Sequence, residues 1–263
     1  MARPSTANTQ ATLDRAQELM YEAWDADSPK RRIALAEKAL SLSPLCADAY
    51  VLLAGHAKRG SDQELDLWRQ GVDAGTKALG KAGFDEYAGG FWGVPETRPY
   101  MRARLGLALA LWARGFRMEA IHHLTDMLRL NPNDNQGARY ILAAFLLEAA
   151  RDKDLAVLLK QYQDDSAAAW SWTAALAAFR RAGDGKKSRA LLAQALAGNK
   201  YVPAYLCGAR RIPRSLPSYI SPGRADEAIH YAADFRAGWI NTPGAIDWLR
   251  AHAPTPQGKS KTA

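Results

Sequence analysis

The chain has 263 residues, of which 48% are hydrophobic and 24% charged, and this balance excludes a wholly disordered, collagenous or disulfide-dense protein. Cys46 and Cys207 are too few and too far apart for a secreted disulfide framework or a zinc site, so they indicate a reducing compartment in which each fills a small apolar gap. No signal-like segment and no run of about 18 apolar residues occurs, so we expect a cytoplasmic protein without a membrane role.

The net charge of +8 is concentrated in one region. Between Gly183 and Ser215 there are seven Lys and Arg residues and one Asp. Such a region is either a solvated face or a surface for an anionic partner. No aromatic RNA-binding strand motif and no zinc-finger spacing accompanies it, so nucleic acid is the less favoured partner.

Apolar residues recur at three- and four-residue spacing, and period-two alternation is nearly absent, so the chain is predicted to be all-α. The clearest pattern is in 101–132, where two amphipathic helices meet at Arg114 and Gly115 and Pro132 ends the second. Related patterns predict five helical pairs, at 13–24 with 33–44, 50–54 with 65–80, the two halves of 101–132, 138–149 with 155–162, and the two halves of 172–195.

Small residues at Ala108 and Ala120 let the two helices of 101–132 approach closely, as in a tetratricopeptide repeat. A helical pair cannot bury its apolar face alone, so successive pairs are expected to stack. We therefore predict a TPR-like right-handed α-superhelix with a concave face, forming a single domain over 9–252.

Two segments interrupt the repeats. The stretch 81–99 is rich in glycine and aromatic residues and is predicted to be irregular, with Phe91 and Trp92 favouring a docked loop over a binding loop. The stretch 210–223 is a proline-rich break. A C-terminal helical cap follows at 226–235 and 245–250, with Thr242 as N-cap and Pro243 at the first helical position. The ends 1–8 and 253–263 are expected to be disordered.

Four strings carry a more specific signal: ETRPYMRARLGLALALW, LNPNDNQGARYILAAFLLE, NKYVPAYL and ADEAIHYAADFRAGWINTPGAIDWL. Over 96–252 they resemble the TPR-like region of the suppressor of tumorigenicity 7 protein family and its shorter bacterial relatives. The resemblance implies a bacterial helical-repeat protein without established enzymatic activity. Its eukaryotic members resemble membrane proteins with apolar N-terminal spans, which this chain lacks, so no membrane or tumour-suppressor role is carried over.

No catalytic motif is present, whether for a nucleophile, a phosphate-binding loop or a dinucleotide site. His122 and Asp126 share a helix face beside His123, but without a third ligand they make a poor metal site. Asp152 and Asp154 are interpreted as helix-start residues. We expect no enzyme activity, no catalytic residue, no metal and no cofactor.

The first helices of successive repeats would line a concave groove. Its predicted residues are Arg102, Trp112, Gln136, Arg139, Trp170, Thr173, Arg180 and Arg181. Arginine guanidinium groups form paired hydrogen bonds with carboxylates, and tryptophan rings provide large apolar contact surfaces. Both suit a protein or peptide, including an acidic one, so the leading hypothesis is a non-enzymatic interaction scaffold. On the competing interpretation the tryptophans are packing residues and the arginines are only solvated. Two alternatives remain, a polyanion binder through the basic region 180–214 and an enzyme or enzyme subunit with a pocket near the 89–95 loop.

Overall fold

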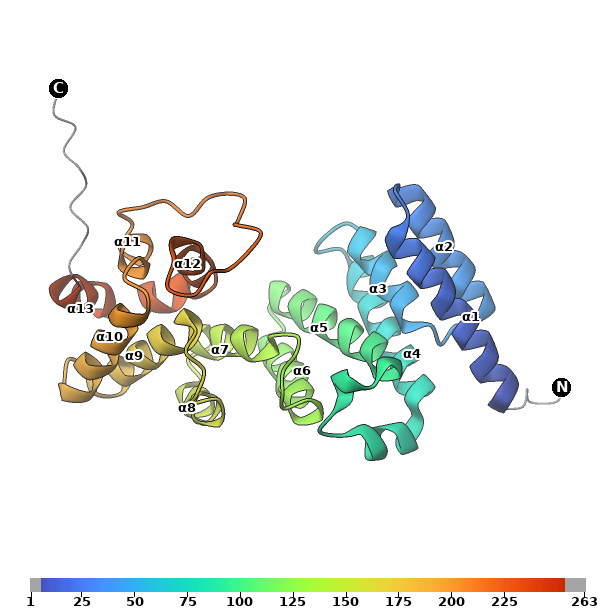
Figure 1. Ribbon diagram of the computed structural model, residues 1–263, viewed down its shortest axis with the longest axis horizontal. Helices are drawn as coiled ribbons and strands as arrows, with labels where there is room; N and C mark the ends of the chain where they lie inside the picture. Colours follow the sequence, from blue (N-terminus) through green and yellow to red (C-terminus); the bar gives the residue numbers. More distant parts are fainter. Residues whose placement is uncertain (1–5, 254–263) are drawn as a thin grey trace, which may run out of the picture. The chain divides into compact units, whose positions relative to one another are not determined.

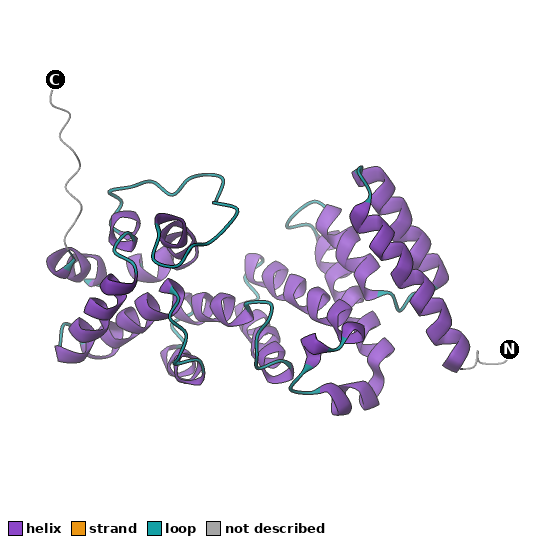
Figure 2. Ribbon diagram, viewed as in Figure 1, coloured by secondary structure: helices purple, strands orange, loops and turns teal. Residues whose placement is uncertain are grey.

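A computed structural model describes residues 6–253. Every regular element in that range is a helix and none is a strand (Figure 2), which confirms the predicted all-α class. The chain divides into two compact units, Met1–Ala138 and Arg139–Ala263, which are called unit 1 and unit 2 and are described separately. The single domain and the right-handed superhelix stay predictions.

Unit 1 is a series of helical hairpins (Figure 1). Its helices are α1 (Thr6–Asp25), α2 (Pro29–Leu42), α3 (Ala47–His56), α4 (Asp62–Tyr87), α5 (Arg98–Ala113) and α6 (Arg117–Leu130). Helix α1 packs against α2, α3 against α4, and α5 against α6, as the first three predicted pairs require. Helix α3 also packs against α5, so neighbouring hairpins share a core.

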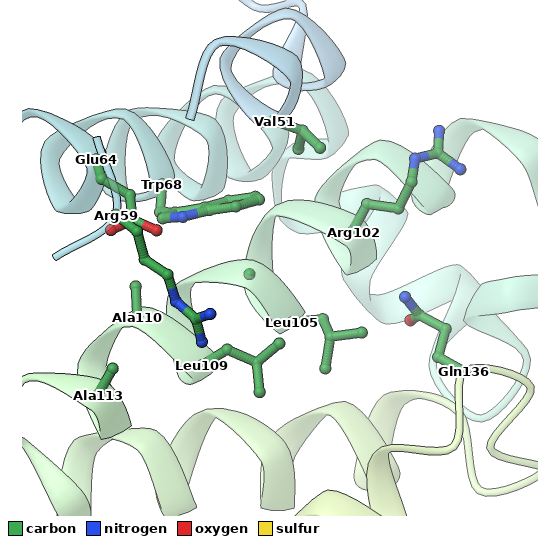
Figure 3. Close-up of a pocket in the computed structure, with 11 residues that line it drawn as sticks. Val51, Arg59, Glu64, Trp68, Arg102, Leu105, Leu109, Ala110, Ala113 and Gln136 are labelled. Carbon is green, nitrogen blue, oxygen red and sulfur yellow. The ribbon is translucent and has the colours of Figure 1, made fainter. Parts of the chain in front are cut away.

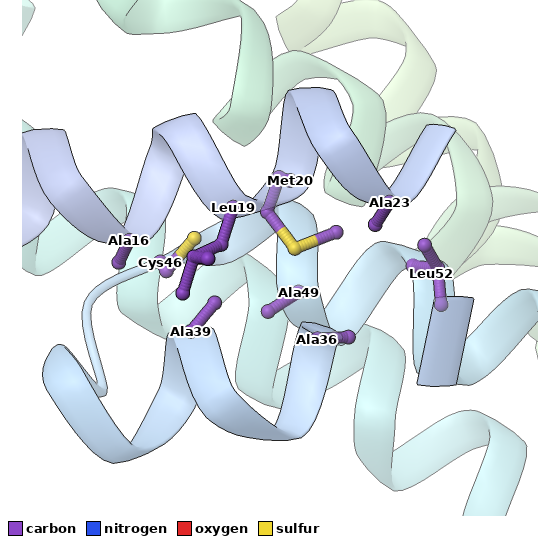
Figure 4. Packing of buried hydrophobic residues seen from close by; sticks show 9 residues of the cluster. All are labelled: Ala16, Leu19, Met20, Ala23, Ala36, Ala39, Cys46, Ala49 and Leu52. Atoms are coloured by element: carbon purple, nitrogen blue, oxygen red, sulfur yellow. The ribbon is translucent and has the colours of Figure 1, made fainter. Parts of the chain in front are cut away.

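The first hairpin shows why these sequences pair. Ser28 caps α2 by accepting a hydrogen bond from the N–H of Arg31, and Pro29 supplies a preset backbone angle at the first turn. Fully buried alanines of α1 and α2 face one another around Met20 and Cys46 (Figure 4). Burial raises the pKa of the Cys46 thiol to about 11, so it stays protonated at neutral pH and fills the predicted apolar gap.

The segment 81–99 was predicted to be irregular throughout, and this is wrong for its first part. Helix α4 kinks at Gly80, whose φ of 58° lies in the left-handed region, and then continues to Tyr87. The continuation is held by tertiary packing, because the Phe84 ring contacts the rings of Phe91 and Tyr100 at centroid distances of 5.3 and 5.1 Å. Two short 3-10 helices follow, η1 (Phe91–Gly93) and η2 (Pro95–Thr97).

The loop that contains η1 is docked, as the packing interpretation expected. Phe91 is fully buried, whereas Trp92 is half-buried with the Arg98 guanidinium over its ring. Backbone hydrogen bonds fix the loop, since the N–H of Gly89 donates to the carbonyl of Leu130. The two adjacent aromatic residues therefore differ in their degree of burial.

Unit 2 has helices at the positions of the fourth and fifth predicted pairs and of the C-terminal cap, and the packing of α9 against α10 confirms the fifth pair. Its helices are α7 (Ala138–Glu148), which begins at the boundary, α8 (Asp152–Gln161), α9 (Ala168–Ala182), α10 (Lys186–Gly198), α11 (Val202–Leu206), α12 (Ala225–Ile240) and α13 (Ala245–His252). Helix α9 packs against α8, α10, α12 and α13. Asp152 and Asp154 lie in the first turn of α8, as predicted. The proline-rich break 210–223 contains no helix, as predicted.

The predicted start of the last helix is wrong. Helix α13 begins at Ala245 after Gly244, which has a φ of 76°. The Thr242 hydroxyl instead donates to the carbonyl of Gly238 in the preceding helix, so it is used there and does not cap α13. Glycine at 244 permits the left-handed turn that redirects the chain.

The expectations for the chain ends are only partly covered. Helix α1 begins at Thr6, so residues 6–8 are helical and the disorder predicted for them is wrong. Ala253 is buried, which contradicts disorder at that position. Residues 1–5 and 254–263 lie outside the described residues. Within 6–253, none of the helices has the length and apolar character needed to span a bilayer.

Candidate functional site

Unit 1 carries a groove with a volume of about 410 Å³ along one side of α5. Figure 3 shows its side chains, which come from α3, the loop between α3 and α4, the start of α4, α5 and the segment after α6. The lining residues are Val51, Arg59, Glu64, Trp68, Arg102, Leu105, Gly106, Leu109, Ala110, Ala113 and Gln136. Most of these side chains are apolar, and Leu109 is 44% exposed although it is a large apolar residue.

The wall of the groove depends on a close approach between Trp68 and Gly106. A Cβ atom at position 106 would lie 2.1 Å from Cζ3 and 2.3 Å from Cη2 of the Trp68 indole. These distances are shorter than any real carbon contact, so only glycine lets the ring lie flat against α5. The glycine within this helix therefore shapes the apolar wall.

The polar groups lie at the two ends of the groove (Figure 3). Arg59 and Glu64 are at one end, and Glu64 accepts a hydrogen bond from the N–H of Gly60. Arg102 and Gln136 are at the other end, so the structure brings these two predicted site residues together.

Arg102 was expected to bind a partner, but its guanidinium is already paired within the chain. Its Nε and Nη2 atoms lie 2.8 and 2.6 Å from the Oδ1 and Oδ2 atoms of Asp48. Its guanidinium also lies over the Trp24 ring, 5.1 Å from the centroid. The Asp48 side chain is fully buried, so this pair is a structural link between α3 and α5 that neutralises the charge of Arg102.

Gln136 lines the groove and contains one polar atom that is not satisfied within the chain. Its Oε1 is buried, and no hydrogen-bond donor in the described part of the chain reaches it. A buried acceptor without a donor costs about 1 to 3 kcal/mol. Gln136 therefore lines the groove with an acceptor whose hydrogen-bonding capacity is not used within the described chain.

The other predicted groove residues do not line this groove. Trp112, also in unit 1, is half-buried with the Arg117 guanidinium over its ring at 5.2 Å from the centroid. In unit 2, the Nε of Arg139 donates to Oδ2 of Asp165 at 2.8 Å. The hydroxyl of Tyr140 donates to the same oxygen at 2.7 Å, so Asp165 already occupies the arginine fork.

The predicted groove role of Trp170 and Thr173 is wrong. They are 3% and 0% exposed, and a buried side chain cannot contact a bound peptide. Trp170 packs edge-on against Tyr140 and Tyr162, as the packing interpretation of the tryptophans required. Trp170 and Thr173 therefore stabilise the interior of unit 2.

The last two predicted arginines, on α9, differ from each other. Arg180 donates to the carbonyl of Leu147 at 2.8 Å and forms an ion pair with Asp152 at 3.0 Å. Arg181 is exposed. Three of the four predicted groove arginines thus meet an aspartate within their own unit, which removes most of the basis for an acidic peptide.

The histidine cluster on α6 is organised by a buried arginine. Arg104 forms an ion pair with Asp126, and its Nε donates to Nδ1 of His123 at 3.2 Å. Burial, followed by the positive charge of Arg104, lowers the pKa of His123 to about 4. Burial alone would raise the pKa of Asp126, but hydrogen bonds from Arg129 and Arg104 lower it overall. With its carboxylate taken by two arginines, Asp126 is not presented as a ligand beside His122.

A second hollow of about 280 Å³ lies beside the 89–97 loop, where the enzyme alternative placed a pocket. Its lining includes the carboxylates of Asp14, Glu18 and Glu96 next to apolar side chains such as Leu13. The Oδ1 of Asp14 accepts a hydrogen bond from Gln10 at 2.8 Å. The described lining contains no Ser, Cys or His nucleophile or base.

Sequence reasoning did not find Asp48, Gly106 or Leu109 as site residues. An isolated glycine inside the helical pattern of 101–113 was the available signal for Gly106, because glycine there weakens a helix unless packing requires it. Asp48 gave no local signal, since its partner is 54 residues away.

Comparisons with known proteins place the chain among relatives. No family model matches it, and no solved structure matches it. The chain is 27% identical over 88% of its length to the protein ST7 homolog of Caenorhabditis elegans, of which the match covers 49%. It is 25% identical over 89% of its length to the suppressor of tumorigenicity 7 proteins of Macaca fascicularis and Rattus norvegicus, with 52% and 48% of those proteins covered.

The chain thus spans about half the length of the curated relatives that it matches. The similarity covers more of the chain than the segment 96–252 in which the motifs were recognised. The resemblance to the suppressor of tumorigenicity 7 proteins is confirmed as a similarity in sequence, whereas the tetratricopeptide superfamily and a bacterial source stay predictions.

Proposed function

We propose that the chain is a non-enzymatic protein-interaction scaffold, in which the unit 1 groove binds an apolar segment of a partner protein. One observation carries this proposal. Leu109 is 44% exposed next to Trp68 and Leu105, in a hollow of about 410 Å³. Apolar surface left uncovered in a concavity is typical of binding sites.

The charges around the groove favour an apolar occupant over an acidic one. Arg102 is neutralised by Asp48 at one end, and at the other end Arg59 and Glu64 carry opposite charges. No net charge is left to attract an acidic peptide. Affinity would come from apolar anchors placed against Trp68 and Leu109.

A polar anchor supplements the apolar wall. The free Oε1 of Gln136 would accept a hydrogen bond from a backbone N–H of the bound segment, which would end its unsatisfied state. The described lining supplies one carboxylate, Glu64, and no Ser, Cys, His or Tyr side chain. A groove of this chemistry supports binding and offers no nucleophile with a base beside it.

The test uses two leucines with matched exposure. A photo-crosslinking amino acid is placed at Leu109 or at Leu42, which is 43% exposed at the end of α2, away from the groove. We expect a partner to crosslink from position 109 and not from position 42. The crosslinked segment is then synthesised and titrated against the purified full chain by calorimetry.

In that titration Leu109→Glu should weaken binding by at least about tenfold, because a charge replaces a central apolar contact. Leu42→Glu should bind like the unmodified protein. Both variants should keep the melting temperature, since exposed positions contribute little to stability. If both variants weaken binding of the segment equally, or if neither weakens it, the groove is not the binding site.

A further inference from the structure

Unit 2 contains a cavity of about 390 Å³ whose charged lining residues are all of one sign. It lies between the segment after α11 and one side of α12. Its lining residues are Tyr205, Gly208, Arg210, Arg211, Ile212 and Arg236. Three of the six are arginines, and none carries a negative charge.

The backbone around the cavity is fixed. The N–H of Arg210 donates to the carbonyl of Ala204 at 2.8 Å, and the N–H of Gly208 donates to the carbonyl of Tyr205 at 3.3 Å. Helix α11, from which this turn departs, is buried along its whole length. The two loop arginines are therefore presented by a turn that is anchored in the core of unit 2.

Arg236 reaches the same cavity from α12. Its Nε donates to the carbonyl of Leu206 at 3.3 Å, which sets the direction of the guanidinium. A Cβ atom at Gly208 would lie 3.9 Å from Nη2 of Arg236, so this nitrogen lies over a glycine with a φ of 80°. Glycine at 208 is required by its left-handed backbone, and the turn that it permits places loop and guanidinium next to each other.

These three arginines lack the counter-ions that other arginines of unit 2 have. Arg139 and Arg180 each form an ion pair with an aspartate. In the described part of the chain, no ion pair joins a carboxylate to Arg210, Arg211 or Arg236. Three like charges around one cavity repel one another, and an anion bound between them would relieve the repulsion.

We propose that this cavity binds the phosphate group of a phosphate monoester. Arginine forks match phosphate oxygens in pairs, and a monoester carries close to two negative charges at neutral pH. A phosphodiester carries one charge per phosphate and requires a track of cations along the chain. The convergence of three arginines on one cavity therefore favours a monoester over nucleic acid. This site is separate from the unit 1 groove.

The experiment titrates the full chain with inorganic phosphate, phenyl phosphate and a 12-nucleotide single-stranded DNA, using calorimetry at two salt concentrations. We expect phenyl phosphate to bind at both. Arg236→Gln should weaken it by at least about tenfold, the loss typical of a charged hydrogen bond. Because Arg236 also donates to Leu206, the double variant R210Q/R211Q, which changes exposed side chains, provides a second test with the fold intact.

The matched control is Arg214→Gln, which removes the same charge from the same loop without changing the cavity lining. It should bind phenyl phosphate like the unmodified chain. The phosphate group could belong to a small molecule or to a phosphorylated protein, and a comparison of free phosphoserine with a phosphoserine peptide distinguishes the two. Equal affinities for both indicate a small molecule, whereas tighter binding of the peptide indicates a modified protein. Failure of phenyl phosphate to bind, or equal weakening by Arg214→Gln, would overturn the proposal. DNA binding that weakens equally in all variants would indicate a diffuse polyanion surface instead.

Discussion

Arg102 and Asp48 form a bidentate pair that joins two first helices of neighbouring hairpins. The Nε–Oδ1 and Nη2–Oδ2 distances are 2.8 and 2.6 Å, and Gln17 of α1 donates to the same Oδ2 at 2.7 Å. A single buried carboxylate therefore connects α1, α3 and α5. Directed polar contacts of this kind fix how neighbouring hairpins meet, in addition to their apolar packing.

Removing Arg102 should lower the free energy of unfolding more than removing Asp48. Arg102→Ala leaves the fully buried carboxylate of Asp48 without its charged partner, and we expect a loss of roughly 3 to 5 kcal/mol in the free energy of unfolding. Asp48→Ala should cost less, because the Arg102 side chain is 29% exposed and can turn toward water. Urea unfolding followed by circular dichroism measures both values.

The double variant Arg102→Met with Asp48→Leu is the control for this pair. It removes both charges together and should recover most of the loss, since apolar replacement of a buried ion pair is often neutral. A larger loss from Asp48→Ala than from Arg102→Ala would show that the pair is not organised around the buried carboxylate.

The helices were predictable because their signals are local. Ala108 and Ala120 are both fully buried where α5 and α6 meet, as their spacing predicted. The ion pairs were not predictable, because Asp48 and Arg102 are far apart in the sequence and each resembles a solvated residue by itself. The same applies to Asp165, which takes up the fork of Arg139.

Local signals also failed where tertiary contacts decide the outcome. Thr242 has the sequence of a helix cap, yet its hydroxyl bonds to the preceding helix. Phe84 lies in a glycine-rich stretch that predicts irregular structure, yet its aromatic contacts hold the end of α4 in helical form. Packing overrides propensity in both cases.

Phe91 and Trp92, the neighbouring aromatic residues of the docked loop, should contribute unequally to the free energy of unfolding. Phe91 is fully buried against Phe84 and Tyr100, so Phe91→Ala should cost roughly 3 to 5 kcal/mol through lost burial and a cavity. Trp92 is half-buried beneath Arg98, so Trp92→Ala should cost about 1 to 2 kcal/mol. Denaturant midpoints compare the two. Equal losses would mean that the loop buries both rings alike.

Stability should fall between pH 6.5 and 4 because of His123. Burial and the charge of Arg104 lower the pKa of His123 from 6.5 to about 4. In this window the unfolded chain binds a proton that the folded chain does not, so the free energy of unfolding rises with pH. Part of the His123 ring contacts solvent, and screening limits the expected change to roughly 1 to 2 kcal/mol.

The variant His123→Gln isolates this effect. It removes the titrating group, so the free energy of unfolding of the variant should fall less than that of the unmodified chain as the pH falls from 6.5 to 4. Asp126 acts in a lower range, because its pKa is lowered from 3.8 and its contribution is lost only below that value. A variant that keeps the full slope between pH 6.5 and 4 would assign the slope to another group.

The unsatisfied Oε1 of Gln136 should have opposite effects on stability and on binding. Gln136→Leu removes a buried acceptor that has no donor in the described chain, so we expect the free energy of unfolding to rise by up to about 1 kcal/mol. The same change removes the hydrogen-bonding position at one end of the groove, so the partner segment that crosslinks from position 109 should bind about fivefold to tenfold more weakly. Chemical unfolding and calorimetric titration of the same variant give both values. Equal affinity of the variant and the unmodified chain would show that the occupant does not reach Gln136, while a loss of stability would show that its Oε1 is satisfied by solvent.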